Sequence, residues 1–328
     1  MNPPRFFPRS AISRVAVLGL AGLLVFAPEA FAQGKKKNPV SKLFVADVNG
    51  EAVIDTGDSI QDLSQHAVHT AQGAVIETKK PENPNDRSKY YSTMVYSNGT
   101  GSFFDADTQV EVKQFSQEPF VPNRTDLEVE PSISQTQAFV ARGAVGLCVS
   151  KLVAGSTMNY QTPQASVNIR GQKVVIEANK NVTKISMLEG DSTVRAGAMD
   201  MGGHVLHAGE QAIISQAAIG QPNQIQIAKI PDSDMSSLDD KVAMACLAKK
   251  TVYFEVRDKK AESNGGAAEG AGESNSGGGT RVSAFDGDSG KGSDSSQQEI
   301  VPVVVVPTNL PTDYTMSAAR AQTPPTGG

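Results

Sequence analysis

The sequence predicts an all-β protein of stacked short strands, β-solenoid-like or β-sandwich-like, with one C-terminal helix and strand packed on it and a disordered tail. Three observations support this fold class. Apolar and polar residues alternate with period 2, as at Val110 and Val112, which is typical of half-buried strands. Turn signals containing glycine recur about every 8 to 15 residues between 42 and 230. After Pro231 the apolar spacing becomes helical.

The first 32 residues have the three parts of a secretory signal peptide. Three arginines are followed by an apolar run at 15–27, and small residues then stand at Ala30 and Ala32. We predict cleavage between Ala32 and Gln33, which leaves a short leader at 33–41 and no retained transmembrane helix. The protein is then exported, to the periplasm or the cell exterior. The alternative is a buried N-terminal helix.

The segment 42–230 is predicted to form one β-domain, because its apolar stretches are short and turn residues separate them. Strands are expected around Val110 and Val112, between the apolar positions Phe103 and Phe115, and at 42–48, 52–55, 73–78, 93–96, 138–141, 166–169, 174–177, 184–188, 193–195 and 211–215. Turns are expected at the glycines of Asn98–Gly99, Arg142–Gly143, Ala154–Gly155, Arg170–Gly171, Glu189–Gly190, Gly202–Gly203 and Ala208–Gly209.

Residues 231–260 are predicted to add a helix and a strand to this domain. The acidic stretch 232–234 suits a helix start, and apolar residues recur at helical spacing from Leu238 to Leu247. Lys249 and Lys250 suit the negative end of the helix dipole. A strand is expected to follow at 251–257.

The segment 261–300 is predicted to be a disordered linker. It is rich in Gly and Ser, so it has too little apolar surface to offset its chain entropy. The tail 301–328 begins inside the apolar run IVPVVVVP at 300–307. This run is expected to add to a sheet edge of the domain, to a partner, or to neither.

The two cysteines, Cys148 and Cys246, are predicted to form a disulfide. An even number of cysteines in an exported protein favours pairing. Both lie in apolar runs, so two separate buried thiols are the alternative.

The composition disfavours several functions. The net charge is −5, so the chain has no basic excess for binding nucleic acid. Aromatic residues make up 5%, too few to line a typical small-molecule cleft. We find no nucleophile elbow, P-loop or dinucleotide fingerprint, and we expect no catalytic residue and no cofactor.

The four histidines form two pairs, His66 with His69 and His204 with His207. Such pairs suggest zinc ligands, but their spacing places both side chains on one face only in a helix. The second pair lies in a strand-and-turn region, where residues three apart point to opposite faces. We therefore expect solvated histidines and no metal site.

Four stretches together resemble the FecR-type extracytoplasmic domain. They are SNGTGSFFDADTQVEVKQF at 97–115, VNIRGQKVVI at 167–176, MLEGDSTV at 187–194 and VLHAGEQAI at 205–213. Their order and spacing resemble the strand–glycine turn–strand units of that family. The resemblance implies a short-strand β-fold that binds proteins or surface components, without catalytic residues. Family members act in transmembrane signalling through a cytosolic domain and a membrane helix, and this sequence departs from that pattern.

The predicted function is that of an exported, non-enzymatic, FecR-like β-domain, a protein-interaction or sensing module of the cell envelope. Its partner is expected to be another envelope protein, and the oligomeric state stays open. The alternative is a structural, self-assembling envelope protein without a signalling role. Phe103 and Phe104, beside the Asn98–Gly99 turn, are candidates for a contact patch, with a place in the core as the alternative.

Overall fold

The computed structural model of the chain describes residues 41–120, 128–218, 220–258 and 298–304. These residues belong to one compact unit, Asn38–Gly328. The predicted signal peptide at 1–32, with its cleavage site between Ala32 and Gln33, lies outside the described residues. So do nearly all of the leader, most of the linker and the tail beyond 304.

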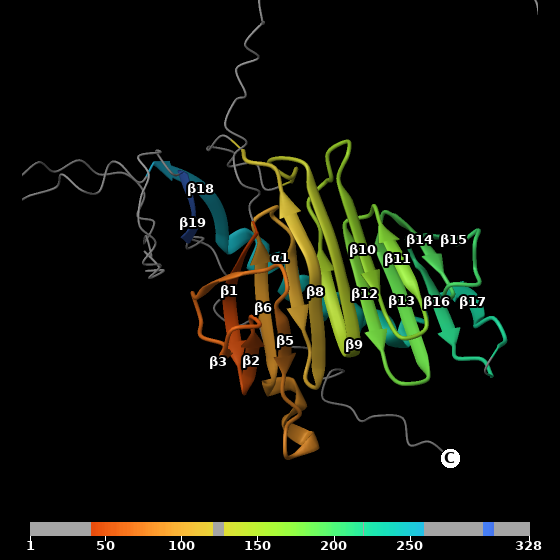
Figure 1. The fold of residues 1–328 in the computed structure, drawn as a ribbon. Helices are drawn as coiled ribbons and strands as arrows, with labels where there is room; N and C mark the ends of the chain where they lie inside the picture. The colour runs from red at the N-terminus through yellow and green to blue at the C-terminus, as the bar shows by residue number, and fades with distance from the viewer. Residues whose placement is uncertain (1–40, 121–127, 219, 259–297, 305–328) are drawn as a thin grey trace, which may run out of the picture. The chain divides into compact units, whose positions relative to one another are not determined.

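Strands β1 to β17 form one hydrogen-bonded network arranged in two facing layers (Figure 1). We call them the helix-side layer and the far layer. The helix-side layer has the order β4 (Val68–Thr70), β1 (Lys42–Asn49), β6 (Tyr91–Tyr96), β7 (Gly101–Phe104), β9 (Ser134–Cys148), β12 (Lys173–Ala178), β13 (Val182–Glu189), β16 (Glu210–Ser215) and β17 (Gln224–Lys229).

The far layer has the order β3 (Ile60–Asp62), β2 (Ala52–Asp55), β5 (Val75–Thr78), β8 (Thr108–Gln117), β9, β10 (Thr157–Gln161), β11 (Ser166–Ile169), β14 (Asp191–Arg195) and β15 (His204–His207). Strand pairs in both layers are antiparallel, apart from the parallel pair β9–β10. A short 3-10 helix, η1 (Pro84–Lys89), precedes β6.

Strand β9 belongs to both layers. Its first half, up to Arg142, pairs with β8, and its second half, from Gly143, pairs with β12. Gly143 has a φ of 91°, and a Cβ there would lie 2.3 Å from Thr108 Oγ1, so only glycine fits. The predicted turn at Arg142–Gly143 is therefore wrong: the glycine bends one 15-residue strand from one layer into the other.

After β9 the chain adds hairpins alternately to the two layers. The hairpin β10–β11 joins the far layer and β12–β13 the helix-side layer. The hairpin β14–β15 then joins the far layer and β16–β17 the helix-side layer. The alternating side chains of both layers fill one apolar core between them, with the Tyr96 and Phe115 rings 5.2 Å apart across the layers. The prediction of an all-β fold with one C-terminal helix is confirmed, in its sandwich-like form.

Helix α1 (Asp232–Thr251) packs across the outer face of the helix-side layer, over β12, β9, β7, β6 and β1 (Figure 1). Its buried side chains cover three apolar clusters of the sheet, around Val175, Phe103 and Phe44. Two sheet glycines allow a close approach. A Cβ on Gly101 would lie 2.1 Å from Ala245 O, and one on Gly146 would lie 2.7 Å from Lys241 O.

The chain ends its described part in a two-stranded sheet of β18 (Val252–Asp258) and β19 (Gln298–Val304). Strand β19 begins inside the segment predicted to be a linker and pairs with β18. It adds to no edge of the main layers in the described residues. Val303 is buried, and Val304 packs on the apolar cluster that contains Phe44. The β-branched residues of the apolar run explain why it forms a strand.

Candidate interaction surface

The structure places Cys148 and Cys246 in a disulfide, with a sequence separation of 98 residues. Cys148 ends β9, and Cys246 lies on the last turns of α1. The bond therefore fixes the helix to the middle of the helix-side layer. It lies in a buried cluster with Phe103, Met244 and Ala245.

Three of the four histidines make separate contacts. His66 stacks on Phe44, with ring centroids 6.0 Å apart, whereas His204 Nε2 lies 3.5 Å from Asp200 Oδ2. The backbone N–H of His207 donates to Glu210 Oε2. Within residues 41–120, 128–218, 220–258 and 298–304, no three His, Cys, Asp or Glu side chains gather as metal ligands would.

Of the two alternatives for Phe103 and Phe104, the contact patch is wrong and the place in the core is confirmed, because both side chains are buried, at 0% and 1% exposure. They alternate on strand β7. Phe104 points into the core between the layers, and Phe103 points into the cluster under α1. The strand is covered on both sides, so an apolar pair next to a turn was no sign of exposure. Even Asn98 of the neighbouring turn is buried.

A fully buried carboxyl group, Glu130, joins three connections at one end of the strands. Its Oε2 accepts a hydrogen bond from Ser134 Oγ at 2.7 Å, and its Oε1 accepts one from the Val153 N–H at 2.7 Å. Asn98 Nδ2 donates to the same Ser134 hydroxyl. Burial raises the pKa of Glu130, against the opposing effect of these donors. A Glu outside any strand pattern gives no sequence signal for such a role.

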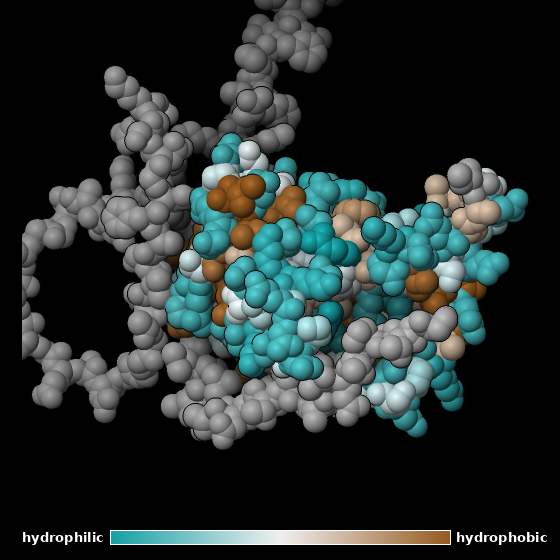
Figure 2. All heavy atoms as spheres, turned by 90° about the horizontal axis from the view of Figure 1, so that it is seen from below, coloured by the Kyte–Doolittle hydropathy of each residue, from teal (hydrophilic) through white to brown (hydrophobic). Residues whose placement is uncertain are grey.

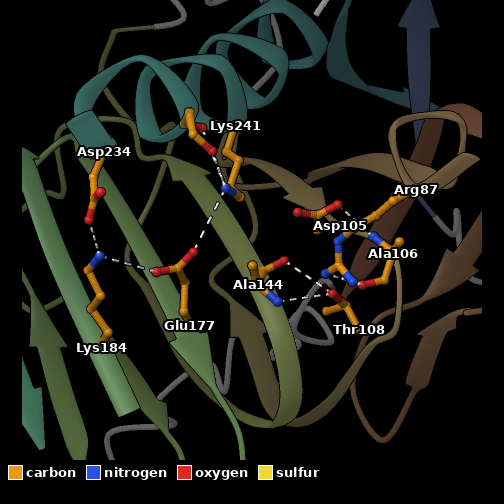
Figure 3. A network of polar contacts seen from close by, with 10 residues as sticks. Arg87, Asp105, Ala106, Thr108, Ala144, Glu177, Lys184, Asp234 and Lys241 are labelled. Carbon is orange, nitrogen blue, oxygen red and sulfur yellow. Dashed lines mark hydrogen bonds and ion pairs between the residues drawn. The ribbon is translucent and has the colours of Figure 1, made fainter. Parts of the chain in front are cut away.

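Two sets of polar contacts join helix α1 to the helix-side layer (Figure 3). Lys184 Nζ on β13 lies 2.7 Å from Asp234 Oδ2 at the start of α1, and this contact lowers the pKa of Asp234. The buried Lys241 donates to Ser237 Oγ and lies 3.8 Å from Glu177 Oε1 on β12. These contacts fasten the first half of the helix to the sheet.

The end of the sandwich at β15 and β17 differs from the covered middle, because large apolar side chains are exposed there. The exposed fractions are 61% for Met199, 85% for Met201, 55% for Val205 and 39% for Ile227. We call these four residues the end surface. Figure 2 shows apolar side chains among polar ones at the end that carries β14 to β17 in Figure 1.

The connection from β14 to β15 presents the methionines because a carboxylate organises it. Asp200 Oδ2 accepts from the Ala196 N–H at 3.0 Å, and its Oδ1 accepts from the Gly203 N–H at 2.9 Å. These two donors lower the pKa of Asp200. With its polar centre turned inward to the backbone, the loop leaves Met199 and Met201 in solvent.

The loop also abuts the start of β17. Asn223 Nδ2 donates to Gln164 O at 2.8 Å, and Asn223 Oδ1 accepts from the Ala217 N–H. A Cβ on Gly197 would lie 3.2 Å from Asn223 Nδ2. Asn223 therefore ties the β16–β17 connection to the far layer, and the methionine loop and β17 form one continuous end of the molecule.

Two strand edges at this end have no partner strand among the residues that the structure describes. In the described residues, β17 pairs with β16 alone and β15 with β14 alone. The Ile230 N–H donates to Gly209 O, and amide directions alternate along an antiparallel strand. The amides of Gln224, Gln226 and Ala228 are therefore directed at β16, and those of Ile225 and Ile227 at the free edge. An unpaired edge beside exposed apolar groups is suited to contact with another protein.

No known family model matches the chain, and no curated protein matches it. Two solved structures of a "putative anti-sigma factor" from Parabacteroides distasonis ATCC 8503 are similar over part of their length. One is 14% identical over 50% of this chain and 62% of the other, with a TM-score of 0.35. The second is 15% identical over 50% and 63%, with a TM-score of 0.34. The match spans about three fifths of either structure.

No helix in the described residues is long and apolar enough to span a membrane.

Proposed function

We propose that the protein is an exported, non-enzymatic, FecR-like interaction or sensing module of the cell envelope, which binds a protein partner through the end surface. The proposal rests on two features that occur together at the β15/β17 end of the sandwich. Four large apolar side chains are exposed there, and the amides of Ile225 and Ile227 face the outer edge of β17, which has no partner strand among the described residues. Exposed apolar groups next to an open edge favour strand addition by a partner.

The signal-peptide pattern supports export, and the disulfide suits an oxidising compartment. The sandwich supplies a rigid base, since α1, the disulfide and the common core hold its middle. Partner contacts at the end then leave the core undisturbed.

The test is capture of a defined partner by the exported protein in the cell envelope, followed by its identification. The double variant M201K/V205K places two charges on the end surface and is expected to lose the partner. The matched control is I60K, which changes another exposed apolar residue, 71% exposed, at the opposite end of the far layer. A partner that I60K loses and M201K/V205K retains would refute the proposed site.

A further inference from the structure

We infer that the end surface binds a second copy of this chain, with the two β17 strands pairing antiparallel about a two-fold axis. The inference deepens the proposed function and rests on it, because it names the occupant of the same surface. Its basis is that β17 is complementary to itself in sequence, hydrogen-bonding direction and charge.

Hydrogen-bonding direction restricts the register. Only residues whose amides face the free edge can form the bonded pairs, and on β17 these include Ile225 and Ile227. A two-fold arrangement centred on Gln226 pairs Ile225 with Ile227 of the second copy, and Ile227 with Ile225 of the second copy. Both bonded pairs are then apolar.

The same register sorts the side chains by face. Ile225 and Ile227 pair with Ile214 and Ala212 of β16, whose side chains are buried in the core between the layers. Their four side chains would therefore continue the apolar core from one copy into the next. Gln226 lies on the opposite, exposed face and would meet Gln226 of the second copy. Two amides can hydrogen-bond each other across such a pair.

Charge favours this occupant as well. The five residues Gln224–Ile225–Gln226–Ile227–Ala228 are uncharged, so no like charges meet across the axis. Lys229, the one charged residue of β17, would lie opposite Asn223 of the second copy. The alternative two-fold register centred on Ile227 would set Lys229 opposite Ile225, which leaves a cation against an apolar side chain. The edge also lacks a proline or a bulge, the features that usually block edge pairing.

A cysteine scan tests the register directly. In the proposed dimer, residue 226 faces itself in a non-hydrogen-bonded pair, where Cα atoms lie about 4.5 Å apart, within the range of a disulfide. Q226C is expected to yield a disulfide-linked dimer, which a reductant separates. Q224C is the matched control, because residue 224 would lie opposite residue 228 and form little crosslink. The native cysteines are paired with each other.

Solution mass tests the assembly without a crosslink. The exported wild-type protein is expected to have about twice the mass of one chain by light scattering. I227P is expected to be monomeric and folded, because that amide faces the free edge and proline removes it without breaking a bond to β16. I227K provides a second route to the monomer, and circular dichroism checks that both variants fold. I60K should remain dimeric.

The outcomes separate this inference from the proposed function. A monomeric wild type with no crosslink in Q226C, which still captures a different protein through Met201 and Val205, would overturn the second copy and leave the interaction module. Equal crosslinking of Q224C and Q226C would overturn the register. A dimer that M201K/V205K and I227P leave intact would overturn both the inferred interface and the end surface.

Discussion

The middle of the sandwich and its β15/β17 end consist of the same kind of strand, but their outer surroundings differ. In the middle, α1 covers the helix-side layer, a disulfide holds it there, and both Phe103 and Phe104 are buried. At the end, two strand edges have no partner strand in the described part of the chain, and Met201 is 85% exposed. On our proposal the difference separates two roles: the crosslinked middle holds the fold together, and the open end provides the contact surface.

The opposite end, at β3 and β4, sharpens the contrast. Those edge strands have three residues each, and β3 carries the exposed Asp62. Short and charged edges are a common protection against unwanted pairing. Strand β17 has six residues, five of them uncharged and consecutive, so it lacks this protection. The four predictions that follow test these differences, beginning with the largest effect.

Removal of the disulfide should lower the free energy of unfolding and leave the association of the folded protein unchanged. The double variant C148A/C246A reopens a sequence separation of 98 residues. The chain-entropy argument predicts a loss of about 4 to 5 kcal/mol in the free energy of unfolding. Denaturant titration measures this loss, and light scattering should show the dimer unchanged wherever the variant is folded. A loss of the dimer from a folded variant would show that α1 controls the end surface.

Substitution by alanine should distinguish buried from exposed apolar residues. Phe104→Ala removes a ring from the core and is expected to cost about 3 to 5 kcal/mol. Met201→Ala removes a side chain that is mostly in solvent, and a change within about 0.5 kcal/mol is expected. Urea denaturation of both variants measures the difference. Similar losses would contradict the distinction between a closed middle and an open end.

Sequence patterns predicted much of the middle and little of the end. Strands β2 and β11 have the predicted limits, because alternation and flanking turns specify them. The long strand β9 was predicted as a short strand and a turn, since a glycine with positive φ bends a strand as readily as it ends one. In strand β17 (224–229), polar and apolar residues alternate with period 2 at its start, but no strand was predicted there. Pairing between distant segments, such as β9 with β12, has no local signal.

The sequence predicted the disulfide, but it did not predict the end surface. Parity of cysteines and the export signal pointed to Cys148 and Cys246, which the structure pairs. The exposure of Met199 and Met201 depends on Asp200 turning inward to backbone amides. That arrangement is a tertiary property of the loop. For Phe103 and Phe104 the sequence left a contact patch and a place in the core open, because it does not show that a helix far along the chain covers one face of their strand.

The buried Glu130 should make stability depend on pH in the direction opposite to a paired surface carboxylate. Its pKa is raised in the folded protein, so folding favours the protonated form. The contribution is fully present below the unfolded pKa of about 4.3 and is lost as the pH rises through the raised value. Glu130→Gln should remove this slope. Glu130→Ala leaves the Val153 N–H and the Ser134 hydroxyl without their acceptor and should cost about 1 to 3 kcal/mol.

Thermal unfolding of the wild type and the two Glu130 variants across acid and neutral pH checks this expectation. Ser132→Ala is a suitable control, because that hydroxyl donates to Glu118 O at an exposed position near the same junction. A wild-type slope that Glu130→Gln leaves unchanged would assign the pH dependence to another group.

A smaller loss of stability than at Glu130, together with a specific effect on association, is expected at Asp200. Its carboxylate holds the loop that presents Met199 and Met201, through the N–H groups of Ala196 and Gly203. Asp200→Ala removes both acceptors at the edge of the domain, and a loss of about 0.5 to 1.5 kcal/mol is expected. Because the loop then loses its fixed conformation, ordering it on association costs entropy, and the dimer should dissociate at a higher protein concentration.

The pH dependence of Asp200 has the opposite sign to that of Glu130. Its pKa is lowered in the folded protein, so its contribution is present above the unfolded value of about 3.9 and is lost as the pH falls through the lowered value. Acid should therefore remove the difference in stability between wild type and Asp200→Ala. Sedimentation equilibrium compares their dissociation, with Asp58→Ala at the opposite end as the matched control. An unchanged dissociation constant in Asp200→Ala would show that the methionine loop contributes nothing to association and that the β17 edge acts alone.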